Sequence, residues 1–188
     1  MSVFEKKAEL RKALKQLRAE LPAEKKHSAD TEIISRLLMT KEYNNAKLLL
    51  CYYGTGTEID TRPLIYAALA NKKRVALPRC NGSEMEFYFV KSFDFLEEGS
   101  FGIMEPDPLK CRQVRDFRGS LLITPGLGFS PAGDRIGYGK GYYDRFMSSY
   151  NGKAVGLCYQ NLVRFNLPVD ENDKQIDILI TEKYTRNI

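Results

Sequence analysis

Residues 120–147 read SLLITPGLGFSPAGDRIGYGKGYYDRFM and pass from a predicted strand through a loop into a predicted helix. Residues 120–124 are mostly apolar and β-branched, which is typical of a buried strand, and Pro125 with Gly126 ends that strand. Ligands of open α/β sheets bind beyond the carboxyl ends of strands. The loop that begins at Pro125 is therefore the first candidate for a binding site.

The second half of this loop has glycine at alternate positions, Gly137, Gly139 and Gly141, with Lys140 between the last two. Glycine lets the backbone come close to a ligand. The start of a helix offers unpaired N–H groups and the positive end of the helix dipole to an anion such as phosphate. The spacing matches neither the P-loop nor the dinucleotide-binding pattern. Two interpretations stay open from the residues alone: a phosphate-binding loop, to which Arg135 and Lys140 add charge, or a flexible glycine turn.

The length and composition are typical of one soluble domain. A chain of 188 residues can bury most of its apolar surface in one core, so we expect a single domain over residues 1–188. No apolar run approaches the roughly 20 residues that span a bilayer, and the amino-terminal segment is too charged for a signal peptide. We expect a cytoplasmic protein without a membrane partner. A monomer is the expectation, and the oligomeric state stays open.

A net charge of +5 suits small acidic substrates and is too small and dispersed to indicate nucleic acid. The four cysteines lie far apart with no C-x-x-C pair, so they indicate reduced thiols and not a zinc site. The single histidine, His27, lies in a polar run that is typical of an exposed helix.

Hydrophobic periodicity predicts alternating helices and strands. Helices are expected over residues 2–21, over residues 22–40 and after Asp60 or Thr61; strands are expected over residues 47–53, 74–78, 86–90, 153–158 and 176–180. This alternation favours a three-layer α/β/α domain with a largely parallel central sheet. Residues 92–118 have few regular patterns and are interpreted as connecting loops, in which residues 101–104 are more typical of core than of a substrate wall.

Several charged residues have two interpretations when spacing is the only guide. Lys7, Arg11, Lys15 and Arg18 form a basic stripe on the first helix, and such a stripe is usually a solvated face. Glu58 suits a residue that complements the dipole of the following helix. Asp173, in the segment PVDENDKQID, suits a turn.

The string TPGLGF, a short polar loop and then RIGYGKGYYDR resemble the signature of the 5-formyltetrahydrofolate cyclo-ligases, also called methenyltetrahydrofolate synthetases. KAELRKALK near the amino terminus, TEIDT at residues 57–61 and PVDENDKQID near the carboxyl terminus extend the resemblance, which is weak over residues 81–118. The resemblance implies a three-layer α/β fold. It also implies an enzyme that converts 5-formyltetrahydrofolate to 5,10-methenyltetrahydrofolate, with ATP as co-substrate, Mg²⁺ as cofactor, and ADP and phosphate as products.

The resemblance also implies roles for individual residues. The positions that match the family's ATP site are Lys7, Arg11, Arg135, Gly137, Tyr138, Gly139, Lys140, Gly141, Tyr142 and Tyr143. Those that match the folate site are Tyr53 and Glu58, and those that match the magnesium site are Asp144 and Asp173. Tyr142 and Tyr143 could face either ligand, or one of them could be a core residue. Tyr138 departs from members that carry a basic residue there. No acid or base beyond these positioning groups is implied, because positioning and charge neutralisation dominate such a reaction.

Two other functions stay open from the residues. A non-enzymatic module that binds a nucleotide or senses a phosphosugar could use the same sheet and glycine loop. An RNA-binding domain would suit the positive charge and the 11 tyrosines, although aromatic and basic residues are not interleaved as in known nucleic-acid motifs.

Overall fold

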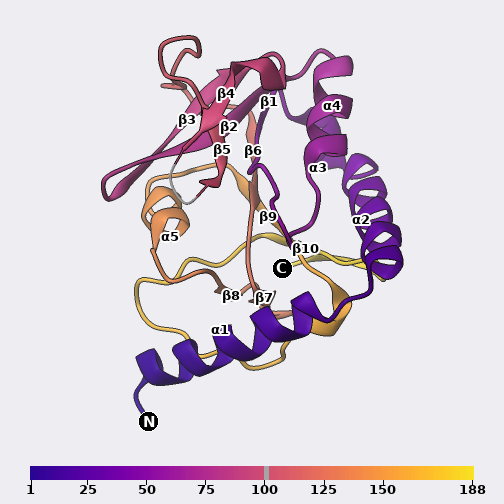
Figure 1. Cartoon of the computed structure of the whole chain (residues 1–188), viewed down its shortest axis with the longest axis vertical. Helices are drawn as coiled ribbons and strands as arrows, with labels where there is room; N and C mark the ends of the chain where they lie inside the picture. The colour runs from indigo at the N-terminus through magenta and orange to yellow at the C-terminus, as the bar shows by residue number, and fades with distance from the viewer. Residues whose placement is uncertain (100–101) are drawn as a thin grey trace.

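The structure is a computed structural model that describes residues 1–99 and 102–188, with a seven-stranded sheet at its centre (Figure 1). The strand order is β11-β10-β9-β6-β1-β2-β3. The parallel strands are β1 (Leu48–Leu50), β2 (Arg74–Asn81), β6 (Ser120–Thr124), β9 (Lys153–Leu157) and β10 (Ile178–Ile180). Both edge strands, β3 (Glu84–Val90) and β11 (Thr185–Asn187), are antiparallel to their neighbours. The predicted, largely parallel sheet is confirmed.

Helices lie on both faces of this sheet (Figure 1). On one side are α2 (Ala23–Leu38), α3 (Lys41–Asn45) and α4 (Arg62–Ala70); on the other is α5 (Tyr142–Met147). The first helix, α1 (Val3–Ala19), crosses one end of the sheet (Figure 1). It begins at a capping box in which Ser2 and Glu5 satisfy each other's backbone N–H groups. The three-layer α/β/α architecture is therefore confirmed.

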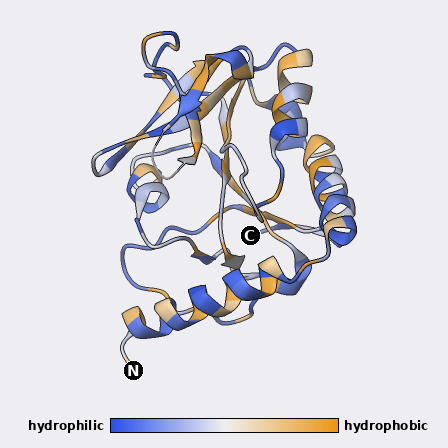
Figure 2. Cartoon of the chain, viewed as in Figure 1, coloured by the Kyte–Doolittle hydropathy of each residue, from blue (hydrophilic) through white to orange (hydrophobic). Residues whose placement is uncertain are grey.

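The core lies between the sheet and its helices. Every residue of β1 and β6 is buried, which explains why these strands have almost continuous apolar runs. Leu14 of α1 is fully buried, as is Leu37 of α2. Figure 2 shows hydrophobic residues concentrated in the central strands and hydrophilic residues over much of α1 and α2.

Several short elements differ from the prediction. Of the strand predicted over residues 47–53, only residues 48–50 form the regular strand β1. Beyond its end, the Cys51 amide still donates to the carbonyl of Ala76 at 3.0 Å. Residues 92–118, interpreted as loops, contain the 3₁₀ helix η1 (Phe93–Phe95) and an antiparallel pair, β4 (Leu96–Glu98) with β5 (Met104–Pro106). These two strands carry Glu and Pro and lack the apolar alternation that predicts a strand.

A second short pair, β7 (Gly128–Phe129) with β8 (Arg135–Ile136), joins the two halves of the loop after β6. The four cysteines are unpaired, as predicted. Burial raises the pKa of Cys158 to about 12, so this thiol stays protonated. His27 is exposed on α2, also as predicted. Within the described residues, no helix combines the length and the apolar character that crossing a membrane requires.

Candidate functional site

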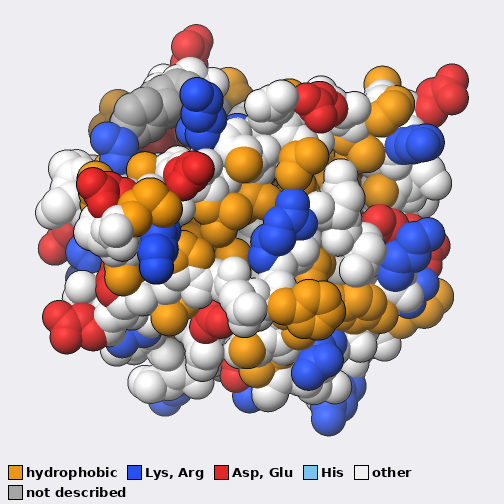
Figure 3. Space-filling view, turned by 90° about the horizontal axis from the view of Figure 1, so that it is seen from below, with side chains coloured by type: hydrophobic (Ala, Val, Ile, Leu, Met, Phe, Trp, Pro, Cys, Tyr) orange, Lys and Arg blue, Asp and Glu red, His pale blue; other side chains and the backbone are white. Residues whose placement is uncertain are grey.

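A cavity of about 980 Å³ lies between α1, the loop after β1, the loop at residues 137–141 and α5. The β1 and β6 strands are adjacent and parallel, so the loops that follow them leave the same edge of the sheet. α1 crosses this edge and contributes Lys7, Arg11 and Lys15, spaced four residues apart and hence on one helix face. Seen from the α1 side, the molecule is hollowed near the centre of this face, where hydrophobic side chains lie between Lys and Arg side chains (Figure 3).

The glycine loop, residues 137–141, has the backbone that its sequence requires. Gly139 has φ = 96° and Gly141 has φ = 71°, both in the left-handed region that favours glycine. The Nε of Arg11 donates to the carbonyl of Gly137 at 3.0 Å. A Cβ on Gly139 would lie 3.2 Å from Cζ of the same guanidinium. The loop and the Arg11 side chain are thus packed in direct contact along one wall of the cavity.

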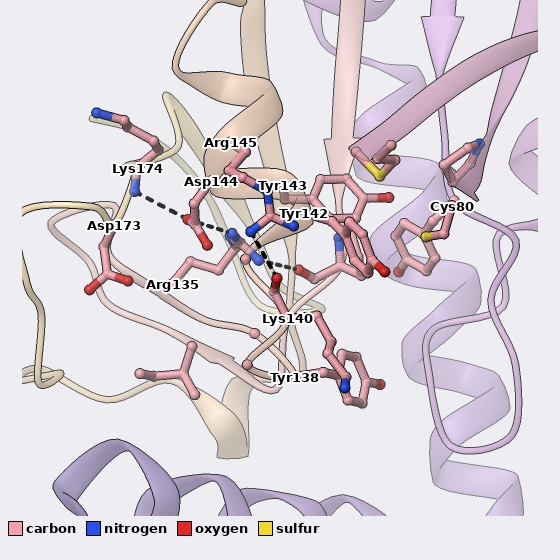
Figure 4. Close-up of a pocket in the computed structure, with 18 of the residues that line it drawn as sticks. Cys80, Arg135, Tyr138, Lys140, Tyr142, Tyr143, Asp144, Arg145, Asp173 and Lys174 are labelled. Carbon is pink, nitrogen blue, oxygen red and sulfur yellow. Dashed lines mark hydrogen bonds and ion pairs between the residues drawn. The ribbon is translucent and has the colours of Figure 1, made fainter. Parts of the chain in front are cut away.

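Arg135 and Asp144 form a largely buried ion pair beside this loop (Figure 4). One guanidinium nitrogen of Arg135 donates to Asp144 Oδ1 at 2.7 Å, and another donates to the carbonyl of Pro125 at 3.3 Å. The guanidinium also lies 5.6 Å from the ring centroid of Tyr143. Arg135 is buried, and its guanidinium contributes a positive charge, paired with Asp144, to the wall of the cavity.

Lys7 lies between two carboxylates of the acidic turn at residues 170–173. Its Nζ is 2.5 Å from Asp170 Oδ2 and 2.5 Å from Asp173 Oδ2. Burial lowers the pKa of Lys7, but the hydrogen bonds to both carboxylates outweigh it and hold that pKa above its usual value. The resemblance implied separate roles for Lys7 at ATP and Asp173 at magnesium. In the structure the two side chains are paired with each other.

Arg18 is buried and connects three loops, so its interpretation as part of a solvated face is wrong. The side chain donates to Thr57 Oγ1 at 3.0 Å, to the carbonyl of Gly126 at 3.3 Å and to the hydroxyl of Tyr138 at 2.6 Å. The Tyr138 hydroxyl donates in turn to Glu58 Oε1 at 2.6 Å. Burial, with the nearby Glu58 carboxylate, raises the pKa of Tyr138, so the hydroxyl keeps its proton.

Tyr53 and Glu58, the two residues that match the folate site, line the same cavity as the glycine loop. The ring of Tyr53 packs edge-on against Phe93 at 5.3 Å between centroids, which fixes its orientation. Thr55 holds Glu58 Oε2 through its backbone N–H at 3.0 Å and its hydroxyl at 3.4 Å. Glu58 lies three residues before Thr61, the N-cap of α4, so it precedes that helix and is not part of its first turn.

Lys140, Tyr142 and Tyr143 also line the cavity (Figure 4). The Tyr142 hydroxyl donates to the carbonyl of Gly82 at 2.9 Å, and Arg145 donates to the carbonyl of Ser83 at 2.6 Å. These bonds anchor α5 to the turn between β2 and β3. The Tyr142 and Arg145 side chains therefore hold the start of α5, and the glycine loop that leads into it, against the turn between β2 and β3.

Sequence reasoning missed part of the cavity wall. Glu105, 5% exposed, lies there with Cys80, and its Oε1 accepts the Cys80 amide at 3.3 Å. Ile103 and Met104 line the cavity too, so their interpretation as core is wrong. Phe101, the first residue of that predicted core segment, lies outside the described residues. Glu105 lies between Met104 and Pro106, and this short segment has no hydrophobic periodicity from which a cavity wall could be predicted.

Asp144 and Asp173, the two carboxylates that the resemblance assigns to a divalent ion, both line the cavity. The Lys174 amide donates to Asp144 Oδ1 at 3.2 Å, which brings the acidic turn next to α5 (Figure 4). Within residues 1–99 and 102–188, no group of three His, Cys, Asp or Glu side chains could hold a metal by itself. Mg²⁺ usually takes one or two carboxylates together with substrate phosphates and water. This donor set therefore fits Mg²⁺ only as part of a complex with a phosphate ligand.

The fold and the cavity together define an α/β protein that binds small molecules at the carboxyl ends of its parallel strands, with a glycine loop and basic side chains suited to an anion. Residues 3–182 match the model of the 5-formyltetrahydrofolate cyclo-ligase family. The chain belongs to this family of enzymes.

Individual relatives agree with this assignment. A probable 5-formyltetrahydrofolate cyclo-ligase of Caenorhabditis elegans is 30% identical over 198 residues, covering 98% of this chain and 96% of that protein. The 5-formyltetrahydrofolate cyclo-ligase of Haemophilus influenzae is 29% identical over 184 residues, covering 94% of this chain and 98% of that protein. The structure of Aquifex aeolicus 5,10-methenyltetrahydrofolate synthetase is similar with a TM-score of 0.86 and 35% identity, covering 96% of this chain and 92% of that one.

Proposed function

We propose that the chain converts 5-formyltetrahydrofolate to 5,10-methenyltetrahydrofolate, with ATP as the second substrate and ADP and phosphate as products. The observation that carries this proposal is that the glycine loop and the Tyr53 and Glu58 side chains line one cavity of about 980 Å³. That volume is at the upper end of the range of small-molecule pockets. A phosphate on one wall could therefore reach a folate on the other.

The triphosphate binds along the glycine loop in this proposal. The N–H groups of residues 137–141 and the start of α5 receive its oxygens, and Arg11, Arg135 and Lys140 supply positive charge. Lys7 reaches the phosphates by exchanging Asp170 and Asp173 for them. Tyr142 and Tyr143 complete the wall next to them.

The folate binds on the opposite wall. The pterin ring has N–H donors along one planar edge, and the Glu58 carboxylate is a suitable acceptor for them. The half-buried ring of Tyr53 offers an aromatic face or edge to the pterin. This arrangement would direct the formyl group toward the phosphate side of the cavity.

The reaction then needs little proton transfer from the protein. The formyl oxygen attacks the terminal phosphorus of ATP, and ADP leaves. The neighbouring folate nitrogen attacks the formyl carbon, which the new phosphate has made electrophilic. The carbon–oxygen bond then breaks, and the phosphate leaves with the proton that the attacking nitrogen gives up. The side chains named above hold the two substrates in line and offset the phosphate charge. Asp144 and Asp173 would hold Mg²⁺, which neutralises phosphate charge when it is bound.

The test is to mix the protein with Mg-ATP and 5-formyltetrahydrofolate and to follow the near-ultraviolet absorbance of the methenyl product. We expect the absorbance to rise only when protein, ATP and folate are all present, with one ADP released per product formed. ATP binding without turnover would contradict the proposal and favour the non-enzymatic nucleotide-binding module. The cytoplasmic location, the monomeric state and the single domain stay predictions.

A further inference from the structure

The Glu58 carboxylate, proposed above to bind the folate, accepts three hydrogen bonds from other residues of the chain. Thr55 supplies two of them, both to Oε2, from within the same loop. The third is the hydroxyl of Tyr138, which donates to Oε1 at 2.6 Å from 80 residues away in the sequence. That distance is typical of a strong bond to a charged acceptor.

Arg18 fixes the direction of this third bond. A guanidinium can only donate, so the Tyr138 oxygen accepts from Arg18 and its own hydrogen is directed to Glu58. The Arg18 side chain is itself held by Thr57 and Gly126. The three side chains therefore form one chain of hydrogen bonds that runs from α1 across the glycine loop to the folate wall.

An ionised carboxylate has about four acceptor positions. Three of those on Glu58 are taken, so a planar ligand edge with two N–H donors finds one position too few. Thr55 cannot easily yield, because it belongs to the same short loop as Glu58 and bonds through its backbone. Tyr138 yields more easily: the residue as a whole is 42% exposed, although its hydroxyl lies against Arg18 and Glu58, and it is flanked by Gly137 and Gly139.

We propose that the Tyr138 hydroxyl occupies the folate-binding position of Glu58 in the free protein and that the substrate displaces it when it binds. The inference rests on the proposed function, since it takes Glu58 as the pterin-binding carboxylate. It moves Tyr138 from the ATP site, where the resemblance put it, to the folate site. It also makes the glycine loop respond to folate, because the displaced side chain belongs to that loop.

The experiment compares the wild type with Tyr138→Phe, which removes the hydroxyl and keeps the ring that lies near Lys15 and Arg18. Calorimetric titration with 5-formyltetrahydrofolate is done with and without a non-hydrolysable ATP analogue. We expect the dissociation constant of the variant to be about three- to tenfold lower, the change expected when one competing hydrogen bond is removed. Tyr88→Phe is the matched control, because Tyr88 donates to Glu86 at 3.0 Å outside the cavity, and it should leave the dissociation constant unchanged.

A second pair of variants tests whether the gain acts through Glu58. In a Glu58→Gln background, which weakens folate binding, Tyr138→Phe should give no further gain, and the difference between the two backgrounds measures the coupling. Thermal unfolding of each variant shows that it is folded. If the wild type binds the folate and Tyr138→Phe binds it equally or more weakly, the displacement is wrong and the proposed function stands. If the wild type does not bind the folate under either condition, both are wrong.

Discussion

At the scale of single residues, the site is a set of charges whose partners are other site residues. Arg135 is paired with Asp144, and Lys7 is paired with Asp170 and Asp173. A buried charge is costly unless it is paired, so these ion pairs lower the cost of holding the charges at the cavity wall. A triphosphate with its ion brings both signs of charge and can exchange partners with them.

Substitution of Lys140 tests whether the glycine-loop wall of the cavity binds phosphate. Lys140→Ala should raise the KM for ATP about tenfold or more, because a hydrogen bond between charged groups is lost, and should leave the KM for the folate nearly unchanged. Steady-state kinetics with each substrate varied in turn would measure this. Lys91→Ala, at an exposed position outside the cavity, is the control for loss of one positive charge. An unchanged ATP dependence in Lys140→Ala would rule out its role.

The residues that gather at the cavity were predictable, but their partners were not. Residues 137–144 come together at one cavity with Arg135 because they are close in sequence and their turn and helix signals are strong. The bond from Tyr138 to Glu58 spans 80 residues, and the one from Lys7 to Asp170 spans 163. Such pairs depend on tertiary packing, which periodicity does not report. Arg18 was misinterpreted for the same reason.

At the scale of elements, the glycine loop offers a matched pair of backbone tests. Gly141 and Gly119 have almost the same positive φ, 71° and 70°. A Cβ on Gly119 would meet nothing within 4 Å, whereas one on Gly141 would lie 2.7 Å from the Arg145 guanidinium, which donates to the carbonyl of Lys140. Only the second substitution therefore disturbs the phosphate wall.

We predict that Gly119→Ala and Gly141→Ala share a loss of stability of about 1–2 kcal/mol, the cost of a left-handed alanine. Gly141→Ala should in addition weaken ATP binding, because Arg145 and the start of α5 must shift. Urea unfolding and calorimetric titration with a non-hydrolysable ATP analogue would measure the two effects. Equal ATP affinity in both variants would show that the loop is a flexible turn without a role in phosphate binding.

The contact between α1 and the acidic turn should depend on pH. The hydrogen bond from Lys7 holds the pKa of Asp170 below its usual value of 3.8. A carboxyl whose pKa is lower in the folded state stabilises the fold above its unfolded pKa, and this stability is lost as pH falls through the folded value. The free energy of unfolding should therefore decrease as the solution is acidified below about pH 4.

Urea unfolding at a series of pH values between about 3 and 6 would measure this slope. In Lys7→Met the decrease should be shallower, because Asp170 loses the partner that lowers its pKa. Lys41→Met, which removes an exposed lysine at the start of α3, should keep the wild-type slope. A slope that is the same in all three proteins would show that Lys7 does not stabilise the acidic turn in solution.

The main elements were predictable because their signals are local. The continuous apolar runs of β1 and β6 and the leucine spacing of α1 indicated buried strands and a helix at about the observed positions. The strands β4 and β5 were missed, since they are short and their residues do not alternate. The edge strand β11, TRN, is fully exposed and therefore has no apolar pattern either.

At the scale of the whole molecule, the order of the strands creates the site. The placement of β6 beside β1 brings the loop that carries Glu58 next to the loop that carries Arg135, although the two lie far apart in sequence. α1 crosses the end of the sheet where these loops emerge and forms another wall of the cavity (Figure 1). The general rule for parallel sheets located the site, but only the strand order shows which loops share it.

The central claim, that the backbone at residues 137–141 holds the triphosphate beside the folate wall, is tested most directly by a crystal structure with Mg²⁺ and a non-hydrolysable ATP analogue. We predict phosphate oxygens within hydrogen-bonding distance, about 2.7–3.2 Å, of the N–H groups of the glycine loop, with Arg135 and Lys140 next to them. A nucleotide bound elsewhere in the molecule, with the glycine loop free of phosphate, would contradict the claim.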